Sequence, residues 1–428
     1  MKFSFLIPSK NRLELVAHAV ESILRQDYEN FEIIISDNAS DQDYGSFVKD
    51  IGDDRIIYNR LSTPVSVTQN WNNALNLASG DYILMLGDDD ALTPGFIQRV
   101  SKLIDDMECP DILYCAAYHY CYPNVIASEP TGYLADVSNS EFFAGKSTPF
   151  RLIPEQAQRA AKAIFDMRYL FGFNSQHFLF RSGFLREIAT SSIGSIFQSP
   201  YPDTFAAAVS FLKAKTIVVI PTPMIIIGIS PKSFGYYYFN NLRTEGSEFL
   251  DNELVSQDIR ESLGNIVLPG NSNNTNWLVA AEAARIALSP ELKIPINIDR
   301  YRTLQIVAFL NDIFLVKVRK LEELDQLTPK LSPSENLFLT TLLSAIGTDD
   351  TAYSKAHNIL SNQEKQLEQF CPAKINILPI GQHTSIIDAY NWLAEHPAVA
   401  KSTRNPFISR LRKILRKSNR LILKIRGE

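Results

Sequence analysis

The 428-residue sequence predicts an α/β protein, a mostly parallel β-sheet with helices on both faces, followed by a mainly α-helical C-terminal region. Over the first 120 residues, short apolar runs alternate with segments whose apolar residues recur at helical spacing. The runs are almost uninterrupted, as in FEIIISD (31–37), which is typical of strands that are buried on both faces. Beyond residue 230 this alternation stops and helical patterns dominate.

These patterns assign the elements in chain order. We expect strands at residues 2–7, 31–37, 55–59, 82–87, 111–118 and 177–182, and a strand pair across 216–229. We expect helices at residues 13–26, 69–79, 96–107, 204–214, 277–287 and 303–324. Thr93-Pro94 predicts the start of the helix at 96–107, and Ser332-Pro333 with Glu335 predicts a further helix start. The expected domains are 1–232 (α/β), 233–400 (mainly helical) and 401–428 (a basic tail).

The net charge of −5 is unevenly distributed along the chain. Residues 401–428 contain ten Lys and Arg and one Glu, so the tail carries +9 and the remainder −14. An acidic body argues against nucleic-acid binding. Within 405–426, apolar side chains fall on one helical face and most basic ones on the other. This pattern predicts a peripheral contact with an anionic membrane, or docking on the protein's own acidic surface or on a partner.

Targeting signals are not evident in the sequence. The N-terminus turns polar too soon for a signal peptide, and Pro221 and Pro223 interrupt the longest apolar run. The four cysteines have neither paired nor metal-ligand spacing, which favours a reducing compartment. We therefore expect a cytoplasmic protein, held at the inner face of the membrane if the tail binds lipid.

Three consecutive aspartates, Asp88 to Asp90, follow the strand expected at 82–87. Like charges at such short distances repel one another, and Thr93 already accounts for the cap of the next helix. Two interpretations remain: a solvated acidic turn, or a site for Mn²⁺ or Mg²⁺ bound by one or two carboxylates and by substrate phosphates. We favour the cation site.

Two other strand ends are also polar, with PSKNR at 8–12 and SDNASD at 36–41. Ligands bind at the carboxyl ends of parallel strands, where such side chains either cap helices or contact a base or ribose. The sequence contains neither GxGxxG nor GxxxxGK[ST], so a dinucleotide fold lacks support and a P-loop enzyme is excluded.

The order and spacing of four motifs resemble a bacterial family 2 glycosyltransferase with the GT-A fold, over about residues 1–230. The motifs are IPSKNR, ISDNASD, QNWNNAL followed by SGDYILMLGDDD, and PYPDTFAAAV. The resemblance implies transfer of a sugar, with inversion, from a nucleotide-diphosphate donor to a hydroxyl group. It further implies a UDP-linked donor, Mn²⁺ or Mg²⁺ as cofactor, and a saccharide or lipid-linked acceptor in cell-surface polysaccharide synthesis.

The resemblance also implies roles for individual residues. Asp89 would be the main metal ligand with support from Asp90, and Asp203 the catalytic base. The nucleotide-sugar-binding residues would be Pro8, Asn11, Arg12, Asp37, Asn38, Asn70 and Asp88. Many members have Asp at the position of Asn38, so the base of the donor is left open, although an amide can still accept from the uracil N–H. Many members also have Asp at the position of Gly87, as the first residue of their acidic motif, and for this reason Asp89 is taken as the main ligand. His177 is a candidate acceptor contact, although a structural role is favoured.

Two other functions use similar residues. A nucleotidyltransferase acting on sugar phosphates needs a Gly/Arg/Lys-rich triphosphate loop, which SKNR matches poorly. An inactive GT-A scaffold or binding subunit would not need to retain the three aspartates and Asp203.

Overall fold

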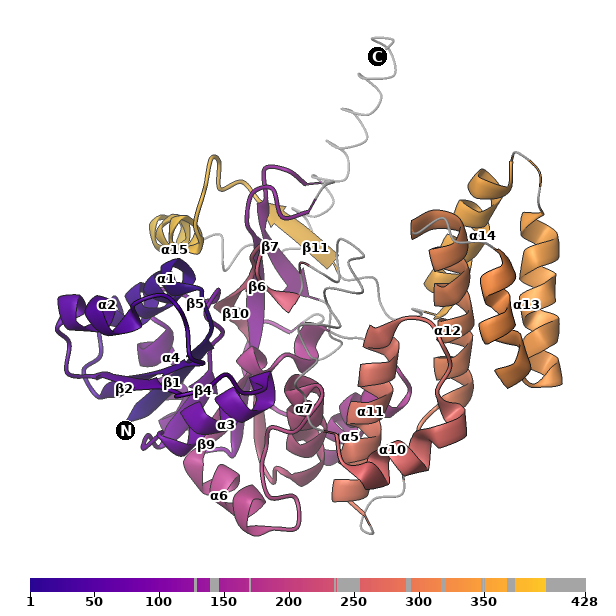
Figure 1. Ribbon diagram of the computed structural model, residues 1–428. Helices are drawn as coiled ribbons and strands as arrows, with labels where there is room; N and C mark the ends of the chain where they lie inside the picture. The colour runs from indigo at the N-terminus through magenta and orange to yellow at the C-terminus, as the bar shows by residue number, and fades with distance from the viewer. Residues whose placement is uncertain are drawn as a thin grey trace.

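The structure is a computed structural model (Figure 1). It describes residues 1–126, 129–138, 146–168, 171–234, 236, 255–289, 294–316, 321–347, 349, 351–367 and 374–397. The tail helix predicted at 405–426 lies outside the described residues.

Strands and helices alternate through the first 121 residues, as the sequence predicts. The elements are β1 (Phe3–Ser9), α1 (Leu13–Leu24), β2 (Phe31–Asp37), α2 (Tyr44–Ile51), β3 (Ile56–Arg60), α3 (Val67–Asn76), β4 (Tyr82–Met85), β5 (Ala91–Leu92), α4 (Phe96–Asp106) and β6 (Ile112–Cys121). They are followed by β7 (Tyr133–Ser138), β8 (Phe150–Arg151), α5 (Pro154–Phe165), the 3₁₀ turns η1 (Phe171–Phe173) and η2 (Ser175–His177), β9 (Phe178–Arg181), α6 (Ser182–Thr190), α7 (Pro202–Lys213) and β10 (Ile217–Ile229).

Together with β11 (Lys374–Leu378), these strands form one mixed sheet in the order β11-β7-β6-β9-β4-β1-β2-β3, with β10 paired to β5, β6 and β8. Strands β3, β2, β1 and β4 are parallel, whereas β9 runs antiparallel between β4 and β6. Strand β10 runs parallel to β6, so the carboxyl ends of β6 and β10 lie together. The α/β fold class is confirmed.

Helices cover both faces of the sheet because alternate strand residues point to opposite sides. Phe5 and Ile33 pack with Val20 of α1 and Val100 of α4 on one face. On the other face Leu6 and Ile34 share a core with residues of α3, α5 and α7. Helix α11 (Ser272–Ala287) extends this second core, where the Trp277 indole N–H donates to the Ile164 carbonyl at 3.0 Å.

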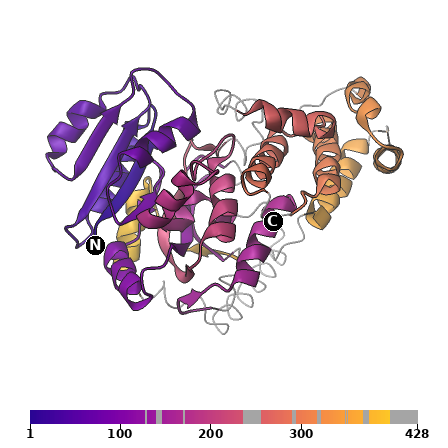
Figure 2. The ribbon, with the colours of Figure 1, turned by 90° about the horizontal axis from the view of Figure 1, so that it is seen from below.

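A mainly helical region follows β10, as predicted. It contains α10 (Gln257–Leu263), η3 (Gly264–Ile266), α11 (Ser272–Ala287), α12 (Ile298–Asn311), the π turn η4 (Asp312–Val316), η5 (Leu321–Gln326), η6 (Thr328–Lys330), α13 (Pro333–Ile346) and α14 (Ala352–Leu367). Helices α12 to α14 enclose their own apolar core to one side of the sheet (Figures 1 and 2). No described helix is both long and apolar enough to cross a bilayer.

The chain then returns to the sheet through β11 (Lys374–Leu378) and α15 (Ile386–Glu395). Strand β11 pairs antiparallel with β7, and α15 lies beside α1 (Figure 1). The Tyr120 hydroxyl of β6 lies 2.8 Å from His383 Nδ1, and Arg25 donates to Asn391 Oδ1 at 2.6 Å. The domain limits 1–232 and 233–400 stay a prediction, and 374–397 packs on the sheet of the first unit.

Three local expectations were wrong. Helix α4 begins after Gly95 rather than Thr93, because the Thr93 hydroxyl donates to the Met224 carbonyl at 2.8 Å instead of capping the helix. Residues 217–229 form one strand with register shifts at its prolines, not a strand pair. The helix expected at 303–324 ends at Asn311 and continues into a π turn. The capping box of Ser332 and Glu335 is confirmed.

Candidate active site

Polar strand ends meet at one edge of the sheet. Because β1, β2 and β3 are parallel and in register, Ser9 pairs with Asp37 and Asp37 with Arg60. The backbone N–H of Leu86 donates to the Leu6 carbonyl at 2.9 Å, so β4 delivers residues 87–90 beside the end of β1. We call residues Gly87 to Asp90 the acidic turn.

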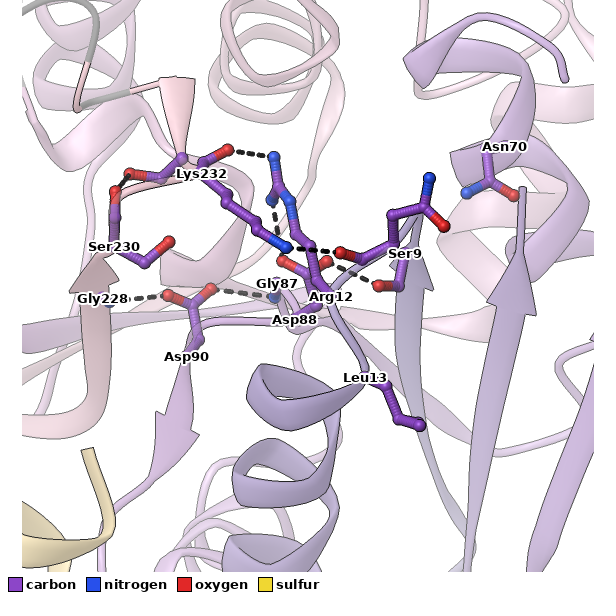
Figure 3. Close-up of polar contacts among 12 residues, drawn as sticks. Ser9, Arg12, Leu13, Asn70, Gly87, Asp88, Asp90, Gly228, Ser230 and Lys232 are labelled. Carbon is purple, nitrogen blue, oxygen red and sulfur yellow. Dashed lines mark hydrogen bonds and ion pairs between the residues drawn. The ribbon is translucent and has the colours of Figure 1, made fainter. Parts of the chain in front are cut away.

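Asp88 is neutralised by the loop that joins β1 to α1. Its Oδ1 lies 2.9 Å from Nη1 of Arg12, and its Oδ2 accepts a hydrogen bond of 2.7 Å from the Ser9 hydroxyl (Figure 3). The Tyr44 hydroxyl lies 2.8 Å from Ser9 Oγ and accepts from the backbone N–H of Arg12. This buried aspartate therefore already has a cation and a hydroxyl donor.

Asp90 is held by backbone groups instead. Its Oδ2 accepts from the N–H of Gly87 and its Oδ1 from that of Gly228, each at 2.8 Å (Figure 3). These bonds tie the acidic turn to β10. A Cβ atom on Gly228 would lie only 1.9 Å from the Asp89 carbonyl oxygen, so the close approach requires glycine here. Burial, followed by the charge of Asp89, raises the pKa of Asp90 well above its usual value.

Asp89 differs from both neighbours because its Oδ2 is buried without a hydrogen-bond partner. Asp89 is 7% exposed, and the hydroxyl group of Ser230, the residue directly after β10, lies near its carboxylate. Burial and the charge of Asp88 raise the pKa of Asp89 to about 6, against the opposing effect of Arg12. An unpartnered buried carboxylate oxygen is costly, and a bound cation would relieve that cost.

No three described His, Cys, Asp or Glu side chains are grouped so that they could hold a metal ion alone. The residues fit a different arrangement, in which one carboxylate oxygen of Asp89 and the phosphates of a substrate share the ion. Because both oxygens of Asp90 face backbone N–H groups, a direct ligand role for Asp90 stays a prediction.

The residues assigned to the nucleotide surround the ends of β1 and β2. Asp37 accepts from the Ser40 N–H at 2.8 Å and from the Tyr58 hydroxyl at 2.9 Å. The Asn38 amide makes two bonds with the backbone of Val65, at 2.8 and 2.9 Å, which fixes the loop before α3.

The remaining assigned residues are held just as firmly. Asn70 is buried and bonds to Ser36, so it joins α3 to β2. Asn11, which has a positive φ of 56°, is fixed by Ser40 and Asp41, and Pro8 is buried within β1. The nucleotide-binding roles of all these residues stay predictions.

Asp203 lies in the first turn of α7, directly after Pro202. Its Oδ1 accepts a 2.6 Å hydrogen bond from the backbone N–H of Ser175 in η2, and burial raises its pKa to about 6. The next residue in η2 is Gln176, whose side-chain amide nitrogen lies so close to Gly87 that a Cβ atom added to Gly87 would be 3.3 Å from it. The turn η2 therefore connects Asp203 to the acidic turn. His177 is buried, and its Nδ1 lies 2.6 Å from the Cys115 carbonyl oxygen, which accords with a structural role.

Sequence reasoning missed the contribution of β10 and the residues after it. Gly228, Ser230 and Lys232 all border the acidic turn or the loop after β1. A glycine inside an apolar strand was the available signal, because it often marks close backbone approach. Nothing local distinguished Ser230 or Lys232.

Residues 4–163 match the family described as "Glycosyl transferase family 2". This part of the chain is therefore similar to family 2 glycosyltransferase domains. The match includes the acidic turn and ends before Asp203 and β10.

Several known proteins are similar to this part of the chain. A "GalNAc(5)-diNAcBac-PP-undecaprenol beta-1,3-glucosyltransferase" of Campylobacter jejuni is 40% identical over 107 residues, 24% of this chain and 34% of that protein. The "UDP-Glc:alpha-D-GlcNAc-diphosphoundecaprenol beta-1,3-glucosyltransferase WfaP" of Escherichia coli is 32% identical over 117 residues, 27% of this chain and 45% of that protein. The "Abequosyltransferase RfbV" of Salmonella typhimurium is 34% identical over 121 residues, 27% and 35% of the two chains. The chain thus spans between about a third and a half of these relatives' lengths.

Among solved structures, S. aureus TarS 1–349 in complex with UDP-GlcNAc matches with a TM-score of 0.45 and 15% identity. That alignment covers 88% of this chain and 97% of TarS 1–349.

Proposed function

We propose that this chain is an inverting glycosyltransferase that transfers a sugar from a nucleotide diphosphate, UDP-linked, to a hydroxyl group of a saccharide or lipid-linked acceptor. The observation that carries the proposal is the unpartnered Asp89 oxygen beside Asp88, at the polar strand ends of the family 2 domain. The names of two relatives refer to undecaprenol, and one also refers to UDP-Glc, which supports this choice of substrates in surface polysaccharide synthesis.

The donor would lie along the ends of β1, β2 and β4. Asp37 and Asn38 would face the base and Asp88 the ribose. Pro8, Asn11, Arg12 and Asn70 would shape the walls of this site. Since their hydrogen bonds are already made within the protein, they would bind the nucleotide with little rearrangement.

Asp89, with support from Asp90, would hold Mn²⁺ or Mg²⁺ together with the diphosphate. Such a cation stabilises the charge that develops on the leaving diphosphate. The proposal does not need a complete protein cage, because phosphate oxygens supply the other ligands.

Asp203 would act as the general base. As the bond from the anomeric carbon to the diphosphate oxygen breaks, the acceptor oxygen attacks the opposite face and gives its proton to the carboxylate. A pKa of about 6 suits this task, because the group is mostly ionised at neutral pH yet basic enough to take a proton. The Ser175 N–H fixes its orientation.

The tail at 405–426 would bring the enzyme to an anionic membrane surface at the cytoplasmic face. Each Lys or Arg near such a surface contributes about 1 kcal/mol. Binding there would place the catalytic domain near a lipid-linked acceptor.

The direct test is release of the nucleotide from UDP-glucose, UDP-N-acetylglucosamine and UDP-galactose, with Mn²⁺, with Mg²⁺ or with EDTA. We expect slow metal-dependent hydrolysis by the wild type, loss of hydrolysis in Asp89→Ala, and no loss in Asp105→Ala, an exposed aspartate on α4. A thermal-shift screen of UDP, GDP and ADP would report binding independently of turnover. If no nucleotide stabilises the protein and no donor is cleaved, the proposal is wrong. Turnover that persists in EDTA would refute its metal component alone.

A further inference from the structure

The two loops that flank the acidic turn are joined by a reciprocal contact. Nη2 of Arg12 donates to the backbone carbonyl of Lys232, and Nζ of Lys232 donates to the backbone carbonyl of Asn11 at 2.7 Å (Figure 3). We call these three residues the clasp. It connects the loop between β1 and α1 with the segment that follows β10, although the two are about 220 positions apart in sequence.

The loop side of the clasp is rigid. The backbone N–H of Asn11 donates to Ser40 Oγ at 2.8 Å, and its side-chain oxygen accepts from the Asp41 N–H at 2.7 Å. Arg12 is the N-cap residue directly before α1 and is held to Asp88 through Nη1. The carbonyl that Lys232 contacts is therefore fixed in position beside the acidic turn.

The Lys232 ammonium group retains capacity for a further ligand. An ammonium has three N–H donors, and one of them is directed to the Asn11 carbonyl. Within the described part of the chain, Lys232 forms no ion pair with a carboxylate, and its side chain is exposed. A lysine at a strand-end site whose ammonium group bonds, among the described residues, to a neutral carbonyl is available to an anion.

The place of Lys232 is set by β10. Gly228 bonds to Asp90, and Ser230 lies against the buried carboxylate of Asp89, two residues before Lys232. The segment from Gly228 to Lys232 thus runs beside the acidic turn, and the ammonium group of Lys232 lies close to the guanidinium group of Arg12 (Figure 3).

We propose that Lys232 binds the diphosphate of the donor, beside the acidic turn, and stabilises it as the leaving group. The inference rests on the proposed glycosyl transfer and adds to it a residue from outside the span of the family match. The electron pair of the broken bond remains on the diphosphate oxygen, and the ammonium group offsets that charge. A purely structural clasp is the competing explanation.

The test compares the binding of UDP with that of uridine, measured calorimetrically in Mn²⁺ for the full chain and for Lys232→Gln. Loss of one charged hydrogen bond should weaken UDP binding by about tenfold to a hundredfold and leave uridine binding within twofold. Lys232→Arg should recover most of the UDP affinity. The matched control is Lys215→Gln, an exposed lysine that pairs with Glu187 at 3.1 Å and precedes the amino end of β10, whereas Lys232 follows its carboxyl end.

The outcomes separate this inference from the function on which it rests. If the wild type binds UDP, and Lys232→Gln binds it equally well, the inference is overturned while the glycosyltransferase proposal stands. A lower melting temperature with an unchanged ratio of UDP to uridine affinity would assign Lys232 a structural role only, which also overturns it. If the wild type binds neither UDP nor GDP, both proposals fail together.

Discussion

Replacing Asp89 by Asn should stabilise the unliganded protein while abolishing the metal-dependent nucleotide binding that we propose. The pKa of this aspartate is raised from 3.8 to about 6 by burial and by Asp88, so its ionised form is disfavoured in the fold. A shift of about two units corresponds to about 3 kcal/mol at neutral pH as an upper value, and loss of the attraction to Arg12 reduces the gain. We expect a gain of about 1–3 kcal/mol.

The pH dependence fixes the sign of this effect. A carboxyl group with a raised pKa stabilises the fold fully at pH values below its unfolded-state pKa, and that contribution is lost as the pH rises through about 6. The wild type should therefore lose stability between about pH 4 and 6 relative to the Asn variant. At the unfolding entropy usual for a chain of 428 residues, the gain corresponds to about 1–3 °C in melting temperature at pH 7.5.

Calorimetric melting at pH 4.5 and pH 7.5, with and without Mn²⁺ and UDP, measures both effects. The matched control is Asp90→Asn, which should destabilise the protein because its amide nitrogen would face the N–H of Gly87 or Gly228. An Asp89→Asn variant that melts below the wild type at pH 7.5, or that keeps its stabilisation by Mn²⁺ with UDP, would refute the reasoning.

Three further predictions follow from the site and the tail. Asp203→Asn should keep its affinity for UDP and lower kcat by about a hundredfold or more. The kcat of the wild type should fall as the pH drops through about 6, the pKa of Asp203. If the variant loses UDP binding, Asp203 contacts the donor instead of acting as the base. Gly228→Ala should lower the free energy of unfolding by about 1–3 kcal/mol and weaken UDP binding, because the added methyl group would collide with the Asp89 carbonyl. A urea unfolding curve identical to that of the wild type would contradict this prediction. Truncation after Ser402 should abolish sedimentation with anionic vesicles and leave hydrolysis of the donor intact; equal sedimentation of both proteins would rule out membrane binding by the tail.

The parts of the fold that sequence predicted well are those determined by local pattern. Strands such as 31–37 are continuous apolar runs that suit a sheet buried on both faces, and the structure places β2 there. The capping box of Ser332 is a local motif and forms as expected. In each case the determining interactions lie within a few residues of one another.

The errors arise where distant contacts override local preference. Thr93 is a good N-cap residue, yet its hydroxyl bonds to Met224, 131 positions away, because β5 pairs with β10. The return of β11 and α15 to the sheet depends on pairing with β7 and packing against α1, which no local pattern encodes. Lys232 belongs to the candidate site for the same reason, because β10 carries it there.

The three aspartates of the acidic turn look equivalent in the sequence, and the structure distinguishes them by what each carboxylate meets. Asp88 meets a guanidinium group and Asp90 meets two backbone N–H groups, whereas one oxygen of Asp89 meets no hydrogen-bond donor. A diphosphate entering alone would bring further negative charge to this place, and a divalent cation entering alone would lack most of its ligands. The cation would therefore offset the charge of the diphosphate, and the diphosphate would supply the ligands that the cation lacks. Because such coupling is reciprocal, the proposed donor and its metal ion should bind as a pair, with Asp89 as the protein's share of the coordination.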